Sequence, residues 1–186
     1  MKKILCAFIL LFIFVAGALS AENDELNMLR AKMTSKVDDI ENTKYIQTKT
    51  AHRAFKKIFD KNGALFEVEL SQDTITQKVT PVIYIYCTKN GSPLLLKKIV
   101  VNVDKQVFRI NLHGGNTHFS RFPREDRSID LAVISATPHE DLIKAIIKGQ
   151  VVKIRLSGYD DSYDFELEPE FKQALADIWR LYELMQ

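Results

Sequence analysis

The middle of the chain consists of short runs in which apolar and polar residues alternate, separated only by turn residues. These runs cover residues 65–70, 82–87, 99–103 and 107–112. A period of two predicts strands with one buried face. Parallel strands need long crossover connections, usually helices, and no helical segment separates these runs. The pattern therefore predicts an antiparallel sheet, or two such sheets packed as a sandwich, with a hairpin turn at Asp104-Lys105.

The C-terminal third adds two predicted helices. Thr137-Pro138-His139-Glu140 has the order of a capping box, with the hydroxyl at the N-cap, proline at the first helical position and glutamate at the third. The apolar spacing predicts that this helix ends at Gly149, and Pro169 begins the last helix. Residues 151–156 and 163–167 between them predict two strands. Together with the middle of the chain, this order predicts an α+β fold.

An amphipathic helix is predicted over residues 22–43. Its apolar residues recur at steps of three and four, which places them on one face: Leu26, Leu29, Met33, Val37 and Ile40. We expect this helix to lie against its own domain, which spans residues 44–186 as a single unit. The same stripe also fits a coiled-coil seam, so self-assembly through this helix is an alternative.

The first 21 residues have the composition of a cleavable bacterial signal peptide. Lys2 and Lys3 precede an apolar run that ends in small residues, and cleavage is expected after Ser20 or Ala21. The apolar run is shorter than the roughly 20 residues that span a bilayer. The sequence therefore predicts a periplasmic or secreted protein with no stable membrane anchor.

The cysteine content and the charge balance restrict the classes of partner and anchor that this chain can have. Glu22 stands where a lipoprotein would carry its lipid-bearing cysteine, and Cys6 leaves with the leader, so only Cys87 remains and no internal disulfide can form. The chain has 26 basic and 24 acidic residues; removing Lys2 and Lys3 leaves 24 of each. A neutral chain lacks the positive field that attracts phosphate backbones and anionic lipids. No nucleic-acid partner is expected.

Two histidines five residues apart, His113 and His118, are the most suggestive pair for metal chemistry. Histidine and carboxylate bind zinc, and His139, Glu140 or Asp130 would be the third ligand. However, the spacing matches no known closed ligand set, and a solvated loop is the simpler interpretation. No metal, cofactor or catalytic residue is assigned, and a metal-dependent or other hydrolase built on this loop remains an alternative.

Two further groups are candidates for binding. Arg121 and Arg124 flank an aromatic residue and could hold a carboxylate or phosphate, although neighbouring acids neutralise them. Tyr84 and Tyr86 share one face of a predicted strand and would form an adhesive patch if no helix covered them. The expected function is therefore non-enzymatic binding or an envelope-associated role, with a protein or small-molecule ligand and an undetermined oligomeric state.

The C-terminal region resembles a domain of unknown function found in bacterial secreted proteins and lipoproteins. The residues that carry the resemblance are Val152-Lys153-Ile154-Arg155-Leu156-Ser157-Gly158, Asp164-Phe165-Glu166-Leu167 and Phe171-Lys172-Gln173-Ala174-Leu175. It covers about the last 50 residues and extends more loosely back to about Val82. The resemblance implies an antiparallel α+β domain and no particular activity, and this chain departs from the lipoprotein members because it lacks their lipid-bearing cysteine.

Overall fold

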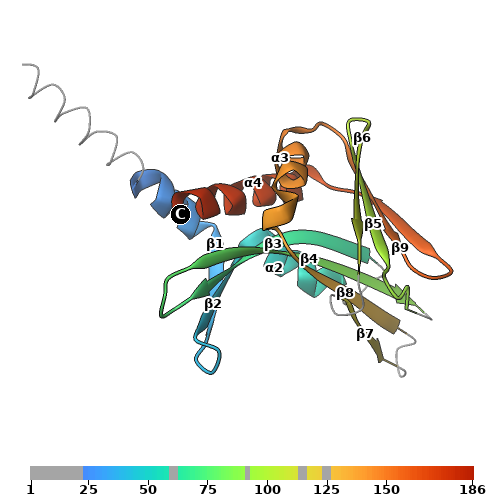
Figure 1. The fold of residues 1–186 in the computed structure, drawn as a ribbon, viewed down its shortest axis with the longest axis horizontal. Coiled ribbons are helices and arrows are strands. Elements are labelled where there is room, and N and C mark those ends of the chain that lie inside the picture. Colours follow the sequence, from blue (N-terminus) through green and yellow to red (C-terminus); the bar gives the residue numbers. More distant parts are fainter. Residues whose placement is uncertain (1–22, 59–62, 91–92, 113–116, 123–126) are drawn as a thin grey trace, which may run out of the picture.

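The computed structural model describes residues 23–58, 63–90, 93–112, 117–122 and 127–186 (Figure 1). The predicted leader lies outside the described residues, so the structure does not test it. Within the described ranges, no helix is both long and apolar enough to cross a membrane. The fold belongs to the α+β class, with antiparallel sheets, as the sequence predicts.

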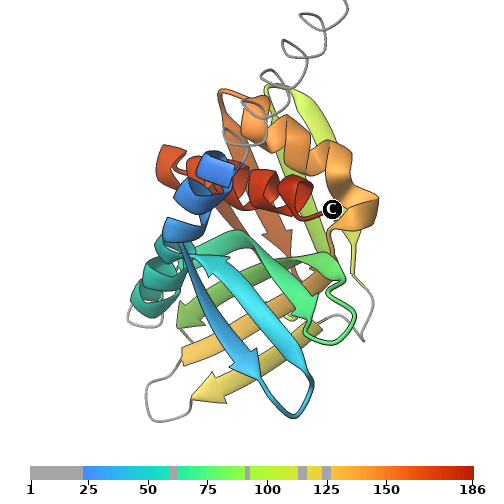
Figure 2. The same ribbon diagram turned by 90° about the vertical axis from the view of Figure 1, so that its left-hand side faces the viewer.

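The larger sheet has six antiparallel strands in the order β1-β2-β3-β4-β8-β7. Their bounds are β1 (Met33–Asp38), β2 (Thr43–Thr48), β3 (Gly63–Asp73), β4 (Val79–Asn90), β7 (Thr117–Phe122) and β8 (Arg127–Ser135). Figure 1 shows that this sheet is curved: its β1–β2 end and its β8–β7 end both turn away from helix α4, which lies over the opposite face. Figure 2 shows the β1–β2 pair in front of β8 and β7.

The smaller sheet has four antiparallel strands in the order β10-β9-β5-β6. They are β5 (Lys98–Val103), β6 (Gln106–Asn111), β9 (Val152–Ser157) and β10 (Ser162–Glu166). The predicted hairpin is confirmed, because Asp104 and Lys105 join β5 to β6 with φ angles of 47° and 79°. Two successive left-handed residues give a turn whose twist matches the strands. The alternation of β9 is also confirmed, with Val152, Ile154 and Leu156 buried.

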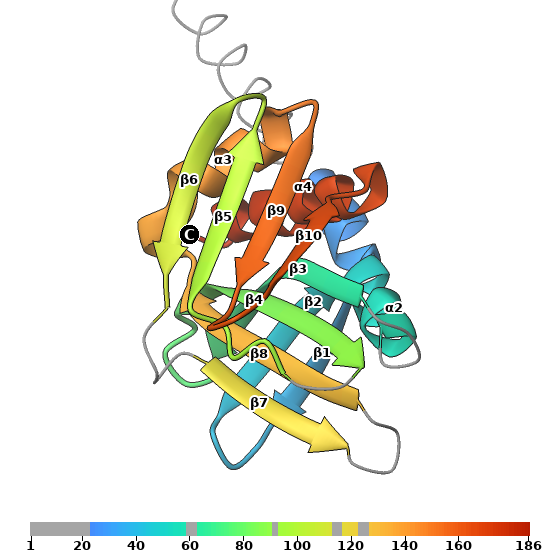
Figure 3. The same ribbon diagram turned by 90° about the vertical axis from the view of Figure 1, so that its right-hand side faces the viewer.

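Helices complete the described part of the fold. They are α2 (Lys49–Ile58), α3 (Glu140–Lys148), α4 (Pro169–Leu184), the 3₁₀ turn η3 (Thr137–His139) and an N-terminal helix described over residues 23–31. In Figure 3 the four-stranded sheet lies in front of α3 and α4, and α2 stands where β3 begins and β4 ends. The inner faces of both sheets and the apolar sides of α3 and α4 form one hydrophobic core.

The N-terminal helix ends earlier than predicted. It ends at residue 31, residues 33–38 form β1, and Ile40 is 94% exposed rather than buried. The helical spacing of the apolar residues was misleading because residues 33–38 hydrogen-bond with β2, and tertiary pairing overrides local periodicity. Two ion pairs hold this N-terminal segment against α4 (Figure 2). Arg180 pairs with Glu25 at 2.8 Å, and Lys32 pairs with Asp177 at 2.9 Å.

The predicted capping box is wrong. Thr137 lies inside the 3₁₀ turn η3, and α3 begins only at Glu140, with no side-chain cap at its N-cap His139. Pro138 supports the 3₁₀ turn instead, which is closed by the bond from the His139 N–H to the Ala136 carbonyl at 2.9 Å. The other signals are confirmed: α3 ends at Gly149, and α4 begins at Pro169.

Candidate functional site

The candidate site lies on the face of the six-stranded sheet that points away from α4. Strand alternation sends Ile83, Ile85 and Cys87 of β4 into the core, and it sends Tyr84 and Tyr86 to the opposite face. This separation was predicted from the sequence and is confirmed. Because the two ends of the sheet turn away from α4, this second face is its concave side (Figure 1).

The strand register assembles four polar residues on this concave face. Glu67 of β3 is directly opposite Tyr84 of β4, and Leu65 is opposite Tyr86. Glu69 lies two residues beyond Glu67 on the same strand, so its side chain points to the same side. We call Glu67, Glu69, Tyr84 and Tyr86 the carboxyl–tyrosine cluster. Val133 and Leu131 of β8 continue the face beside the two tyrosines.

The two tyrosine rings form a flat aromatic surface. Their centroids are 6.1 Å apart and their planes differ by 9°, so the rings of Tyr84 and Tyr86 are nearly parallel. Both side chains are half-buried. Burial together with the neighbouring carboxyls raises the pKa of Tyr84 to about 12, and burial also raises the pKa of Tyr86. The hydroxyl groups are therefore neutral at physiological pH and able to donate hydrogen bonds.

Glu67 is the most unusual residue of the cluster. Its side chain lies in a position with only 6% of its surface exposed, and its Oε2 atom finds no hydrogen-bond partner among the described residues. Burial, and secondly the charge of Glu69, raises the pKa of Glu67 to about 8. Carboxyl groups are rarely this buried unless they are paired. Folding alone does not account for an unpaired carboxyl at this position.

Glu69 is less buried and is partly satisfied by a neighbour. Burial raises the pKa of Glu69 to about 7, although a hydrogen bond from Tyr84 opposes this shift. Tyr45 of β2 extends the polar face, because its hydroxyl donates to Glu41 Oε2 at 2.7 Å. No cation contributes to the pKa shift of either Glu67 or Glu69. The cluster is thus a desolvated acidic and aromatic surface.

The structure accounts for some of the other predicted site residues. His118 lies in β7, not in a loop as predicted, and it is paired with Leu131, in the same row as Tyr86. Arg121 also lies in β7, where its backbone is opposite Ser128. His113 and Arg124 lie outside the described residues. The structure therefore places Tyr84, Tyr86 and His118 in one sheet, and the roles predicted for His113 and Arg124 stay untested.

Asp130, a predicted third metal ligand, has a structural role. Its two carboxylate oxygens each accept a backbone N–H at 2.8 Å, one from Leu94 and one from Leu95. These bonds hold the segment before β5 against β8. Among the residues that the structure describes, no group of three histidine, cysteine or acidic side chains is placed to bind a metal ion. The hydrolase built on His113 and His118 remains a prediction.

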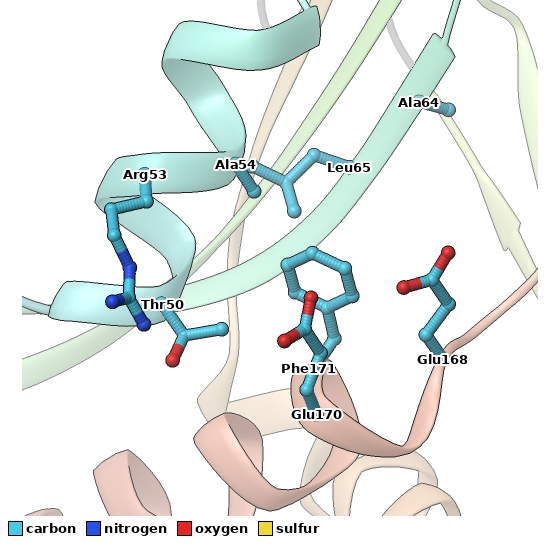
Figure 4. A pocket seen from close by; sticks show the side chains of 8 residues that line it. All are labelled: Thr50, Arg53, Ala54, Ala64, Leu65, Glu168, Glu170 and Phe171. Atoms are coloured by element: carbon cyan, nitrogen blue, oxygen red, sulfur yellow. The ribbon is translucent and has the colours of Figure 1, made fainter.

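Two other surface hollows have a different character. One, of about 540 Å³, lies between α2 and the start of α4 and includes Arg53, Glu168 and Glu170 (Figure 4). The other, of about 620 Å³, lies on the outer face of the four-stranded sheet, where Arg155 is already paired with Asp164 at 2.6 Å. Both hollows mix charges of opposite sign. Within the part of the chain that the structure describes, neither hollow is lined by a buried carboxyl with an unpartnered oxygen, the feature that distinguishes the carboxyl–tyrosine cluster.

Sequence reasoning identified Tyr84 and Tyr86 but not Glu67 and Glu69. The alternation of residues 65–70 placed both glutamates on the polar side of a strand, where solvent exposure is the usual expectation. Their burial depends on the β3–β4 register and on the curvature of the sheet, which no local pattern encodes. Comparison with protein-family models and with curated proteins gives no match for this chain. The resemblance to a secreted bacterial domain therefore remains a prediction.

Proposed function

We propose that this chain is a non-enzymatic binding domain that holds its ligand on the concave face of the six-stranded sheet. The observation that supports this function is Glu67, a buried carboxyl with an unpartnered oxygen beside two parallel tyrosine rings. An unpaired buried polar group destabilises a fold, and such groups concentrate at functional sites. A ligand on this face would supply the missing partner and cover the tyrosine rings.

Binding accounts for the two carboxyls better than catalysis does. An acid–base pair works when its environment pushes the two pKa values apart, so that one group is protonated and the other ionised. Here burial raises the pKa of both groups, of Glu67 to about 8 and of Glu69 to about 7. Both pKa values therefore shift in the same direction and for the same main cause, so the site does not separate them widely.

We also propose that the protein acts outside the cytoplasm, in the periplasm or after secretion. The support for this location is the basic, apolar and small-residue order of the first 21 residues. A domain that folds there with a single buried cysteine, Cys87, needs no disulfide. N-terminal sequencing of the protein recovered from culture medium and periplasm tests the location, and recovery of the full chain from the cytosol alone would contradict it.

The binding face can be tested by NMR of the exported protein labelled on tyrosine. We would titrate it with a mixture of small cationic, neutral and anionic aromatic and aliphatic compounds. The signals of Tyr84 and Tyr86 should shift together, and the double variant Tyr84→Ala/Tyr86→Ala should lose the interaction. Tyr159→Ala is the matched control, because Tyr159 is 65% exposed and lies beside Lys97, in the connection between β9 and β10 of the other sheet. Shifts at Tyr159 alone, or at no tyrosine, would refute the proposal.

A further inference from the structure

We propose that the ligand of the carboxyl–tyrosine cluster is a small organic ammonium cation. Its charged nitrogen would lie between Glu67 and Glu69, and its carbon substituents would lie on the rings of Tyr84 and Tyr86. This inference rests on the proposed function, because it names the chemistry of the same face. It follows from the charge, the burial and the aromatic surface of the cluster.

The two carboxyls attract a positive partner once both are ionised, which the pKa of about 8 for Glu67 places at mildly alkaline pH. Glu67 and Glu69 are two residues apart on one strand, so their Cα atoms are about 7 Å apart and their side chains are parallel. When both ionise they repel one another in a desolvated setting, and Oε2 of Glu67 has no partner among the described residues. A cation between them would relieve the repulsion and supply the missing hydrogen bond at once.

The tyrosines favour an organic cation over a hydrated metal ion. An ammonium group with carbon substituents gains from contact with the negative face of an aromatic ring, most strongly where water is excluded. Tyr84 and Tyr86 present two nearly parallel rings in a row beside the carboxyls. Val133 and Leu131 extend this surface with apolar side chains. The face therefore offers charge at one side and apolar contact at the other.

The surroundings add little positive charge that would compete with a cationic ligand. On the strands that flank the cluster, the described groups on the same face include Tyr45 of β2, Lys36 and Asp38 of β1, and His118 of β7. Arg53 of α2 lines a hollow together with Leu65, the residue opposite Tyr86. Lys36 is exposed and lies opposite Tyr45, at the edge of the sheet. From α2, His52 contacts Gln47 at 3.2 Å through its ring nitrogen. None of these groups contributes to the pKa of Glu67, which responds only to burial and to Glu69.

Other ligand chemistries fit the cluster less well. An anion would be repelled by the two carboxylates, because Lys36, the lysine named on this face, lies exposed at the edge of the sheet. A neutral polyhydroxylated ligand would satisfy Oε2 of Glu67 with a hydrogen bond, but it would leave the repulsion between Glu67 and Glu69 in place. Only a cation would both provide a partner for Oε2 of Glu67 and reduce the repulsion between the carboxylates. We therefore expect the affinity to depend on ionisation of the carboxyls.

Proton linkage gives the proposal a distinctive signature. A cation binds the ionised carboxyls and so lowers their pKa, which means that binding releases protons. Below the pKa of the free carboxyls the ligand must displace those protons, and its affinity falls. With the pKa of Glu67 at about 8, affinity should fall roughly tenfold or more between pH 8.5 and pH 6.5. A neutral ligand would show no such dependence.

Matched pairs of probes test the charge directly. Cyclohexylmethylamine is compared with its neutral isostere cyclohexylmethanol, and benzylamine with benzyl alcohol, by NMR titration of the tyrosine-labelled exported protein. We expect at least one ammonium compound to bind about tenfold more tightly than its neutral isostere at pH 8.5, a difference of about 1.4 kcal/mol. Glu67→Gln should remove that preference. Glu166→Gln, an exposed glutamate on β10 of the other sheet, should retain it.

The outcomes separate this inference from the proposed function. If the neutral isosteres shift Tyr84 and Tyr86 as strongly as the ammonium compounds, the face binds ligands but the charge inference is overturned. If neither member of either pair shifts these tyrosines, the charge inference is overturned as well. The titration with the wider compound mixture then decides whether this face binds any ligand. Should Glu67→Gln fail to fold, Glu69→Gln and the pH dependence of the unmodified protein test the same point, and a flat pH dependence would overturn it.

Discussion

Replacing Glu67 by glutamine should remove a large part of the pH dependence of the free energy of unfolding between pH 5 and pH 7.5, and Glu69 should supply much of the rest. Burial, together with Glu69, raises the pKa of Glu67 to about 8, whereas the reference value for the carboxyl is 4.5. The folded protein therefore holds this proton more tightly than the unfolded chain does. Stability contributed by the protonated carboxyl is complete at low pH and is lost progressively as the pH rises from 4.5 towards 8.

The size of the effect follows from the same two values. Each pH unit within this window costs up to about 1.36 kcal/mol, so the loss between pH 5 and pH 7.5 is about 3 kcal/mol. Glutamine has nearly the same shape and cannot ionise. Its amide, like the carboxyl, would lack a described partner for one polar atom, which costs about 1–3 kcal/mol. That cost is the same at every pH, so it cancels when the pH dependences of the two proteins are compared.

Urea unfolding monitored by the fluorescence of Trp179, the single tryptophan, measures this difference. We expect the stability of the unmodified protein to fall by about 3 kcal/mol more than that of Glu67→Gln over this pH range. Glu166→Gln, on the exposed strand β10, should follow the unmodified protein. Parallel curves for the unmodified protein and Glu67→Gln would show that Glu67 is ionised normally in solution, and the argument for an unpaired buried carboxyl would fail.

Three further changes test how the structure is held together. Lys105→Gly should stabilise the protein by about 1 kcal/mol in urea unfolding, because Lys105 has a φ of 79°; Lys105→Ala should give no gain. Gly158→Ala should lower the unfolding free energy by about 2 kcal/mol or more, because the new Cβ would lie 1.8 Å from the backbone oxygen of Leu94. Two backbone N–H bonds, from Gln150 and Val151, lower the pKa of Asp104 below 3.8. Asp104→Asn should therefore destabilise the protein at neutral pH, and the difference should vanish in thermal melts as the pH falls through the lowered pKa.

The parts of the fold that the sequence predicts are those that local periodicity determines. Strand β9 alternates Val152, Ile154 and Leu156 against charged residues, and its burial follows that alternation. The β5–β6 hairpin depends on a short turn between two apolar runs, which is also a local signal. Helix α4 begins at Pro169 because proline fits the first turn of a helix. In each case the neighbours along the chain carry the information.

The parts that the sequence did not predict depend on contacts between distant segments. Residues 33–38 have an apolar spacing that also fits a helix, and they form β1 because β2 pairs with them. Strand β7 contains His118 within a segment that is rich in polar residues. It forms a strand because its backbone pairs with that of β8. Backbone pairing of this kind has no signature in a single sequence. Helix α2 is a different case: it was not predicted, although its hydrogen bonds are local and its apolar residues recur at helical spacing.

The candidate site shows the same limit in a more informative way. A glutamate on the polar side of an alternating strand is expected to face water. Glu69 is half-buried and departs only partly from that expectation. Glu67 does not meet it, because β4 places Tyr84 directly beside it and helix α2 packs against β3. Replacing Glu67 by an apolar side chain would satisfy the packing without an unpaired carboxyl, so packing gives no reason for an acid at this position. Local rules that fail without a structural gain are expected where a protein meets its ligand. The contradiction between the pattern and the burial of Glu67 is therefore itself the strongest indication of where this protein binds.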